Sequence, residues 1–398
     1  MMKTLTRCIL AALTACLMSS CGWNEPEIAP IRRVVLFYGA AYSNLSSSIE
    51  QDVQELTDGS VSGVGSSDVL LVYTHNTAQY RDFTTPTNPV LFRTYKDLSG
   101  KTRRDTLVVY PDTDVSSSPE VLHKVLGDVK DLFPAKSYGL IFSSHAKGWL
   151  PVNYEDKDDD IIWLSPARSP DTRELGTENQ EGSGIDIRSM VDAIPMPLDF
   201  MILDACLMGC VEFAYELKDK CRTMVLSPTE ILKDGFIYTA MAERIMNTSE
   251  PDLQQICQDY ADFYLAGKGV SPSATITLVD CTRMDALADV CKDLVAAHRY
   301  ELAEVPRGNI QPYFYNELHW FYDLRDVFVQ AGISGDELAR LDEAIADCVL
   351  YSFATETFFG VRMDRVCGLS MYFPYPDKQE LNNYYKTLSW NKATGLIQ

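Results

Sequence analysis

The feature that most constrains the fold is an alternation of apolar runs and amphipathic stretches. Apolar runs typical of strands buried on both faces occupy residues 33–38, 69–73, 138–143, 200–204 and 223–227. Helical patterns lie between them at 45–56, 118–132, 187–194 and 211–220. Strands of this kind are parallel strands covered by crossover helices. We therefore expect an α/β fold with a doubly wound, mainly parallel central sheet.

The remaining segments add further elements to this plan. Two polar-alternating runs within 90–110 predict a hairpin that turns at Ser99-Gly100. Beyond residue 236 the sequence is mostly helical. Helices are expected at 236–247, 252–267, 283–303, 315–330 and 335–351, and strands at 274–279 and 369–373.

The N-terminus has the pattern of an export signal. Lys3 and Arg7 precede an apolar run at 8–18, which is shorter than the roughly 20 residues of a membrane-spanning helix. Small residues then lead into Cys21, as in a bacterial lipobox. We predict cleavage before Cys21 and acylation of its thiol; an ordinary signal peptide cut nearby is the alternative.

This pattern gives a predicted location and a first division of the chain. Residues 1–20 form the lipoprotein signal peptide and residues 21–31 a tether. The protein is expected to be exported to the bacterial cell envelope and lipid-anchored at the outer membrane or cell surface, with release from it as the alternative. A lipid would be its only contact with the membrane.

The charge of the chain excludes one class of partner and favours another. The formal net charge is −21, which repels nucleic acid and anionic lipid headgroups. Such a surface attracts cationic partners and raises their rate of encounter. We expect protein or peptide partners with basic residues, and no nucleic acid.

A histidine and a cysteine each follow one of the apolar runs. His145 comes after the run 138–143, and Cys206 after the run 200–204. The carboxyl ends of neighbouring parallel strands form a common crevice, so the two side chains are expected close together. A thiolate is a nucleophile, and a nearby imidazole can promote its formation or protonate a leaving amine. This pair is the candidate catalytic site.

Taken alone, these residues leave other interpretations open. Of the 11 cysteines, Cys8 and Cys16 lie in the signal region and Cys21 is the lipidation candidate, which leaves 8 without a CxxC pair or a zinc-like spacing. A cysteine in a core strand commonly serves packing alone. His75 also follows an apolar run and is the rival to His145.

Five segments in the same order resemble the clostripain family of cysteine peptidases, which belongs with caspases, gingipains and legumain. The most specific is the nucleophile motif Asp204-Ala205-Cys206-Leu207-Met208-Gly209, with Glu212 behind it. The other four segments lie at 37–45, 138–149, 227–238 and 368–374. Together these segments span most of the mature chain.

The resemblance implies a fold and an activity. It implies a caspase-like α/β/α sandwich, with a catalytic domain at 32–250 and a helix-rich part at 251–398 that contributes strands to the same fold. It implies a cysteine endopeptidase in which Cys206 attacks the scissile carbonyl and His145 protonates the leaving amine. The backbone N–H groups of Cys206 and Ala146 would stabilise the oxyanion.

One residue departs from the pattern of the family. The family usually has glycine directly after the histidine, where this chain has Ala146. If that position requires a positive φ, the methyl group costs about 1 kcal/mol or more and could displace the oxyanion donor. An inactive homologue that binds peptides at the cell surface is therefore the alternative function.

The resemblance also implies specificity for basic residues. The aspartate two positions before the nucleophile lies in the primary specificity pocket of this family, and here it is Asp204. A carboxylate at the base of a pocket pairs naturally with arginine, less often with lysine. Asp234 is a second candidate for the same pocket. The alternative is that Asp204 caps the turn after its strand.

The acidic loop between the histidine and the cysteine carries two further expectations. Some family members need calcium, and the carboxylates of Glu155 to Asp160 are suitable ligands, although their spacing is not that of an EF-hand. The chemistry itself requires no cofactor. Family members can also be activated by self-cleavage in this interval, where the basic residues outside the following helix are Lys147, Lys157, Arg168 and Arg173.

Overall fold

The computed structural model describes residues 30–40, 46–59, 62–75, 87–152, 154, 185–267, 272–313 and 320–398. Residues Ile31–Gln398 form one folded unit, separate from Met1–Pro30. The fold below is that of the larger unit. In the described part of the chain, no helix is both long enough and apolar enough to cross a membrane.

Five neighbouring parallel strands form the centre of a nine-stranded sheet. They are β7 (Cys221–Leu226), β6 (Leu198–Asp204), β5 (Ala135–Ser143), β1 (Ile31–Gly39) and β2 (Asp68–Thr74), in that order across the sheet. They correspond to the five apolar runs of the sequence. The expected α/β fold with a mainly parallel central sheet is confirmed.

Antiparallel strands extend the sheet at both edges. Beside β2 lies the hairpin of β3 (Val90–Lys96) and β4 (Thr102–Val109). Beside β7 lie β8 (Thr275–Asp280) and β10 (Val349–Ala354). The sheet order is β10-β8-β7-β6-β5-β1-β2-β3-β4.

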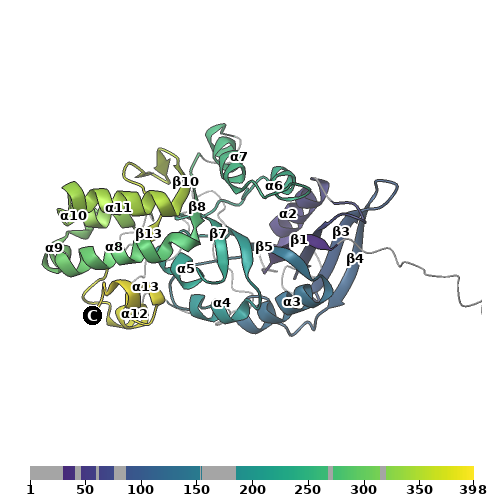
Figure 1. The fold of residues 1–398 in the computed structure, drawn as a ribbon, viewed down its shortest axis with the longest axis horizontal. Coiled ribbons are helices and arrows are strands. Elements are labelled where there is room, and N and C mark those ends of the chain that lie inside the picture. Colours follow the sequence, from purple (N-terminus) through teal and green to yellow (C-terminus); the bar gives the residue numbers. More distant parts are fainter. Residues whose placement is uncertain are drawn as a thin grey trace, which may run out of the picture. The chain divides into compact units, whose positions relative to one another are not determined.

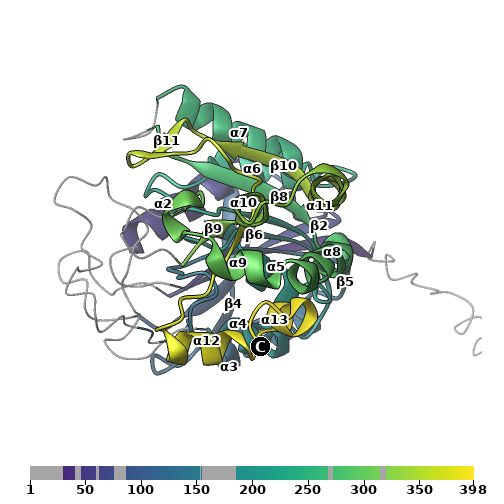
Figure 2. The same cartoon turned by 90° about the vertical axis from the view of Figure 1, so that its left-hand side faces the viewer.

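Helices cover both faces of the sheet because the strands are apolar on both faces. In β1, Val34, Leu36 and Tyr38 pack into one hydrophobic cluster and Val35 and Phe37 into the other. The second cluster lies under α2 (Ser46–Asp58), α6 (Tyr238–Ile245) and α7 (Leu253–Leu265). The first lies under α3 (Pro119–Leu132), α4 (Ile187–Ala193), α5 (Val211–Glu216) and α8 (Met284–Ala297). Figures 1 and 2 show these two layers.

The C-terminal part adds helices to the first layer and several short strands. The helices are α9 (Arg299–Glu304), α10 (Leu324–Gln330), α11 (Gly335–Cys348), α12 (Gln379–Tyr385) and α13 (Ser389–Thr394), with short 3₁₀ turns at Cys281–Arg283 and Arg307–Asn309. The short strands pair as β13 (Ser370–Met371) with β9 (Tyr322–Asp323) and β11 (Thr357–Phe358) with β12 (Val361–Arg362). Figure 2 shows α12 and α13 on the same side of the sheet as α3 and α4.

Four expectations for the C-terminal part are wrong in their bounds. The helix expected at 315–330 begins only at Leu324, because Asp323 pairs with Ser370 and caps α10 by accepting from the N–H of Asp326. The helix expected at 335–351 ends at Cys348, where the chain pairs with β8. In these two places a long-range pairing overrides the local pattern.

The other two expectations cover the wrong length of chain. The helix expected at 283–303 is divided at His298 into α8 and α9. Of the strand expected at 369–373, only β13 is paired.

Candidate active site

The ends of β5 and β6 bring the predicted catalytic residues to one edge of the sheet. The two strands are parallel neighbours, and Ser143 pairs with Asp204 at their carboxyl ends. The N–H of Ser144 then donates to the carbonyl of Asp204 at 3.4 Å, which continues the pairing by one residue. His145 and Cys206 each come two residues after this last register pair. They therefore leave adjacent strands at the same level.

The Cys206 thiol lies in a closed environment. Cys206 is only 2% exposed. Its Sγ accepts from the N–H of Ile231 at 3.3 Å and lies 3.8 Å from the carbonyl oxygen of the same residue. The sulfur thus accepts from the N–H of Ile231 and donates to the carbonyl oxygen of the same residue, so both contacts hold it against the loop after β7.

The turn after Cys206 is strained and is held by the loop that follows β7. Leu207 has φ +63°, a conformation that costs an L-residue about 1–2 kcal/mol. Its N–H donates to the carbonyl of Thr229 at 2.9 Å, and the N–H of Gly209 donates to Ser227 at 2.8 Å. Strain of this kind persists only where surrounding contacts fix the backbone, and it occurs often at active sites.

The loop that carries His145 packs directly on this turn. His145 is half-buried. Gly148 has φ +58°, and a Cβ at this position would lie 2.6 Å from the carbonyl oxygen of Leu207 and 2.5 Å from the ring of Phe321. Only glycine fits this contact. The close approach fixes the histidine loop against the cysteine turn.

Ala146 occupies an ordinary backbone conformation. In the described residues, the non-glycine positions with positive φ are Leu207, Asn247 and Phe359. The glycine-specific conformation in this loop is therefore at Gly148, not at Ala146. The methyl group of Ala146 causes no backbone strain, so the alanine leaves its N–H usable as a donor.

Asp204 is fully buried beneath the site. It is 0% exposed, and its Oδ2 accepts from the Tyr238 hydroxyl at 2.6 Å and from the Ser143 hydroxyl at 3.4 Å. Phe200 and Ile202, two residues apart in β6, face the layer of α2, α6 and α7. Asp204 is the next residue in this alternation of side chains and faces the same layer. Its carboxylate therefore lies on the opposite side of the sheet from the helix α5 that follows Cys206.

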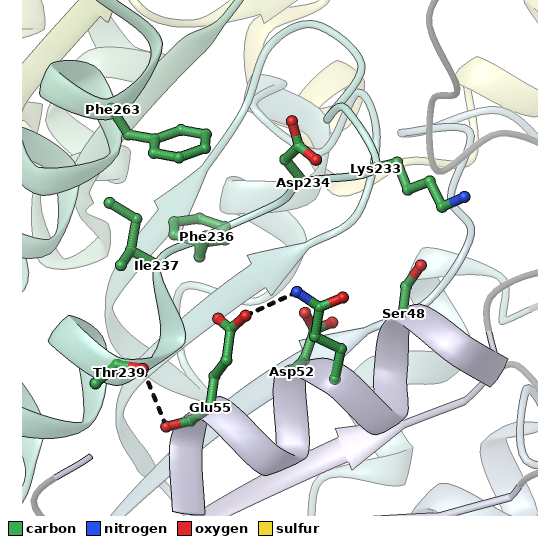
Figure 3. Close-up of a pocket in the computed structure, with 10 residues that line it drawn as sticks. Ser48, Asp52, Glu55, Lys233, Asp234, Phe236, Ile237, Thr239 and Phe263 are labelled. Atoms are coloured by element: carbon green, nitrogen blue, oxygen red, sulfur yellow. Dashed lines mark hydrogen bonds between the residues drawn. The ribbon is translucent and has the colours of Figure 1, made fainter. Parts of the chain in front are cut away.

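Asp234 lies on the wall of an open cavity beside the site. The cavity has a volume of 470 Å³ and lies between α2 and the segment 233–239. Its lining combines three carboxylates with apolar and polar side chains: Asp52, Glu55, Asp234, Lys233, Phe236, Ile237, Phe263, Ser48, Gln51 and Thr239. The Gln51 amide donates to the Glu55 carboxylate at 2.9 Å. Figure 3 shows the Thr239 hydroxyl bonded to the Glu55 carbonyl, a distance of 3.3 Å. The cavity wall is thus preformed and acidic.

His75, the rival histidine, lies elsewhere along this edge. It follows β2, which β1 separates from β5. It is 2% exposed, and its Nδ1 lies 2.8 Å from the Ser116 hydroxyl, which also bonds to the Tyr73 hydroxyl at 2.7 Å. This buried network and the two strands β5 and β1, which lie between β6 and β2, separate His75 from Cys206.

The described residues give no support for a metal centre. They contain no group of three or more His, Cys, Asp or Glu side chains that could hold a metal ion. The acidic run from Glu155 to Asp160 and the lipidation candidate Cys21 lie outside the described residues. Calcium binding and lipidation therefore stay predictions from the sequence.

Three features of the site were not predicted. The Tyr238 hydroxyl that holds Asp204, the Ile231 amide that faces the thiol, and the positive φ of Leu207 all depend on the loop after β7. The segment 227–238 stood out in the sequence only by its resemblance to the family. Its sequence contains no periodicity that would place it against Cys206.

Comparison with known proteins agrees with this geometry. Residues 37–395 match the profile of the clostripain family, peptidase family C11. An X-ray structure of an inactive zymogen C11 protease from Parabacteroides distasonis is 26% identical, with a TM-score of 0.74 over 91% of this chain and 97% of that chain. A secreted C11 cysteine protease from Bacteroides thetaiotaomicron, solved with an irreversible peptide inhibitor, is 24% identical, with a TM-score of 0.74 over 92% and 99%. None of the curated proteins matches the sequence.

Proposed function

The chain belongs to the clostripain family of cysteine peptidases, and on this basis we propose that it is an endopeptidase that cleaves after Arg, less often after Lys, through Cys206 and His145. The observation that carries the proposal is the register of β5 and β6, whose last pair is Ser143 with Asp204. That register supports a common crevice for the cysteine and the histidine, because the carboxyl ends of neighbouring parallel strands form one.

The reaction follows from the groups at this edge. The Cys206 sulfur forms a bond to the scissile carbonyl carbon, and the N–H groups of Cys206 and Ala146 stabilise the oxyanion. His145 gives a proton to the departing amine, and water then hydrolyses the thioester and restores the thiol. The Ile231 N–H, 3.3 Å from the sulfur, holds it in place before attack. The ordinary φ of Ala146 removes the objection that its methyl group displaces the donor.

Burial of the site residues indicates a latent form. Cys206 is 2% exposed and Asp204 is 0% exposed, so a substrate reaches them only after the surrounding loops open. The same burial is what favours the second candidate function, an inactive homologue that binds peptides at the cell surface. Presence of both His145 and Cys206 favours the enzyme, since a binding protein does not need the pair.

Preference for basic residues rests on the carboxylates near the nucleophile. Asp204 lies two residues before Cys206, and Asp234 lies three residues after Ile231, which contacts the thiol. The aromatic walls of the cavity at Phe236 and Phe263 suit the aliphatic stem of an Arg or Lys side chain, and its carboxylates suit the charged head. We propose that Asp204 binds the basic side chain before the scissile bond and that Asp234 attracts it at the cavity rim.

Replacing Asp204 with asparagine tests this specificity. We expect wild-type protein to cleave a fluorogenic peptide ending in Arg far faster than peptides ending in Leu or Asp. Loss of a buried charge partner costs about 2 kcal/mol or more, so kcat/KM for the Arg peptide should fall at least about 30-fold in Asp204→Asn. Asp234→Asn, at an exposed position, should lose no more than about fivefold.

The assay is run with and without calcium, and before and after brief trypsin treatment stopped by a trypsin inhibitor. Circular dichroism and thermal melts check that Asp204→Asn still folds. Equal losses for Arg and Leu peptides in this variant would assign Asp204 a structural role, through Tyr238, instead of a role in specificity. No cleavage of any peptide under any of these conditions would favour the inactive peptide-binding homologue.

We propose that self-cleavage between His145 and Cys206 converts the latent form into the active one. We expect the active protein to contain a cut after Lys147, Lys157, Arg168 or Arg173, the basic residues of that interval outside the following helix α4. Of these four residues, only Lys147 is among the described residues. Mass spectrometry of the wild type during incubation should show the cut, and Cys206→Ala should remain intact. An active enzyme with an uncut chain between 145 and 206 would contradict the proposal.

Export remains a proposal as well. Residues 1–29 lie outside the described residues, so the signal peptide and the acylation of Cys21 rest on the sequence. The B. thetaiotaomicron protein is described as secreted, which supports export of this chain to the cell envelope. A lipid on Cys21 would hold it there.

A further inference from the structure

A carboxylic acid is fully buried directly behind the nucleophile turn. Glu212 comes six residues after Cys206, in the first turn of α5, and is 0% exposed. Its Oε1 accepts from the Tyr385 hydroxyl at 2.7 Å and from the N–H of Tyr372 at 2.8 Å. The Cys210 thiol also interacts with this carboxyl group, and no Lys, Arg or His of the described residues pairs with it. An acid buried without a cation is costly to keep in its charged form.

The segment that contains Tyr372, a partner of Glu212, also contacts the turn after Cys206. Tyr372 follows β13, where the N–H of Ser370 donates to the carbonyl of Gly209 at 2.9 Å and Ser370 forms a parallel bridge with Cys210. The loop after β7 contacts the same turn through Leu207 and Gly209. The strained turn therefore lies between the loop after β7 and the segment 370–372. Glu212 bonds the segment 370–372 to α5.

The same partners also contact the histidine loop. Trp149 lies four residues after His145. Its ring centroid is 4.6 Å from that of Tyr372 and 5.1 Å from that of Tyr385. Trp149 is 0% exposed, and its indole N–H donates to the carbonyl of Trp320 at 3.1 Å. The cluster of Glu212, Tyr372 and Tyr385 thus touches the loops of both catalytic residues.

We propose that Glu212 is a positioning residue for the catalytic pair, because its carboxyl group holds Tyr372 and Tyr385 against the cysteine turn on one side and against Trp149 on the other. The inference rests on the proposed function, in which Cys206 and His145 act together. Glu212 itself is behind the turn and does not touch the reacting atoms. Its effect is on the geometry and rigidity of the two loops.

Because Glu212 can gain or lose a proton, the contacts that it makes with Tyr372 and Tyr385 are expected to depend on pH. Burial raises the pKa of Glu212 to about 7, although the hydrogen bonds from Tyr372 and Tyr385 oppose the rise. The titratable groups that face it are Cys210, Tyr372 and Tyr385, and burial raises the pKa of each of them. Of these groups, only Glu212 changes charge between pH 5 and pH 8.

The sign of the effect on stability follows from the raised pKa. The folded protein holds this proton more tightly than the unfolded chain, whose glutamate has a pKa near 4.3. The contribution to stability is complete below about pH 4.5 and is lost as pH rises through about 7. The folded-to-unfolded ratio should fall by roughly two orders of magnitude across this window on account of Glu212 alone.

Two substitutions and a control test the inference. Glu212→Gln keeps an acceptor for Tyr372 and Tyr385 and stays neutral, whereas Glu212→Ala removes the acceptor. Glu216→Gln is the matched control, since Glu216 lies one turn further along α5 and bonds to the N–H and hydroxyl of Ser389, both at 2.9 Å. Thermal stability, kcat and KM for the Arg peptide are measured from pH 5 to pH 8. Hydrogen exchange followed by mass spectrometry reports on the peptides 145–150, 205–212 and 368–373.

We expect Glu212→Ala to lower kcat at least tenfold with KM changed less than threefold, and to speed exchange in all three peptides at least tenfold at pH 6. Glu212→Gln should stay within threefold of wild type in kcat and exchange at pH 6 and should lose less thermal stability than wild type between pH 6 and pH 8. Glu216→Gln should follow the wild-type pH profile.

An exchange rate in 145–150 and 205–212 that is unchanged in Glu212→Ala would overturn the inference, even if that variant melts earlier. A pH profile of Glu212→Gln identical to that of wild type would also overturn it. If the wild type cleaves no peptide, the proposed function fails, while the exchange measurements still decide whether Glu212 holds the two loops.

Discussion

Replacing Cys206 with alanine should lower kcat/KM for an Arg-ended peptide by at least about 10⁴-fold. The expectation follows from covalent catalysis, in which the thiolate supplies the bond that splits hydrolysis into two easier steps. Alanine leaves the Ile231 N–H without the sulfur that it contacts at 3.3 Å. The turn itself is held by Thr229 and Ser227, so the fold should persist.

His145→Ala should lose a comparable amount, and the double variant should be no worse than either single variant, because the two residues act as a unit. The matched control is Cys291→Ala. Cys291 is 1% exposed in α8, and burial raises the pKa of its thiol, so it should be unreactive. Its kcat/KM should stay within about twofold of wild type, since an inert buried thiol only fills space. Cleavage that survives in Cys206→Ala would assign the nucleophile to another residue.

Replacing Asp68 with asparagine should lower the free energy of unfolding by about 3–5 kcal/mol, the usual cost of removing one partner from a buried ion pair. Asp68 is fully buried at the start of β2. Its oxygens accept from Arg32 Nε at 2.8 Å, Arg32 Nη2 at 2.7 Å, the Asn247 N–H at 2.8 Å and Arg33 Nη1 at 3.4 Å. Arg33 is 2% exposed, so its charge would remain buried without this counter-ion.

Urea unfolding followed by tryptophan fluorescence measures the change. Asp293→Asn is the control, because Asp293 pairs with Arg340 at 3.2 Å while both side chains are more than half exposed. An exposed pair of this kind contributes no more than about 1 kcal/mol. Equal losses in the two variants would show that the Asp68 network is no more important than a surface contact. The network lies at the amino ends of the strands, so both variants should retain the geometry at Cys206.

The five parallel strands of the central sheet were predictable because each is marked by a short run of apolar residues next to one another in the sequence. Residues 33–38 and 138–143 are apolar on both faces, and only a buried parallel strand satisfies that pattern in so few residues. The order of strands along the chain, with crossovers between them, then placed the ends of β5 and β6 at one edge. Where a strand or helix end depended on a distant partner, as at Asp323 and Val349, the local pattern gave the wrong boundary.

The position of the candidate site residues in the sheet was also open to prediction. The sequence placed His145 and Cys206 after neighbouring strands, and the resemblance to a family supplied their roles. It did not reveal that Asp204 bonds to Tyr238, which lies 34 residues further along. Nor did it reveal that the positive φ in the histidine loop belongs to Gly148 and not to Ala146.

The sequence by itself determined the five parallel strands at the centre of the sheet and the two strand ends that His145 and Cys206 follow. These properties depend on hydrophobic periodicity and on residues close together in the chain. Only the tertiary structure decided that Cys206 is closed off, that Leu207 is strained, and that Glu212 meets Tyr372 and Tyr385, 160 and 173 residues away. Periodicity shows that a side chain is buried, but packing between distant segments selects its neighbours. Those neighbours set the protonation of Glu212 and the access to Cys206.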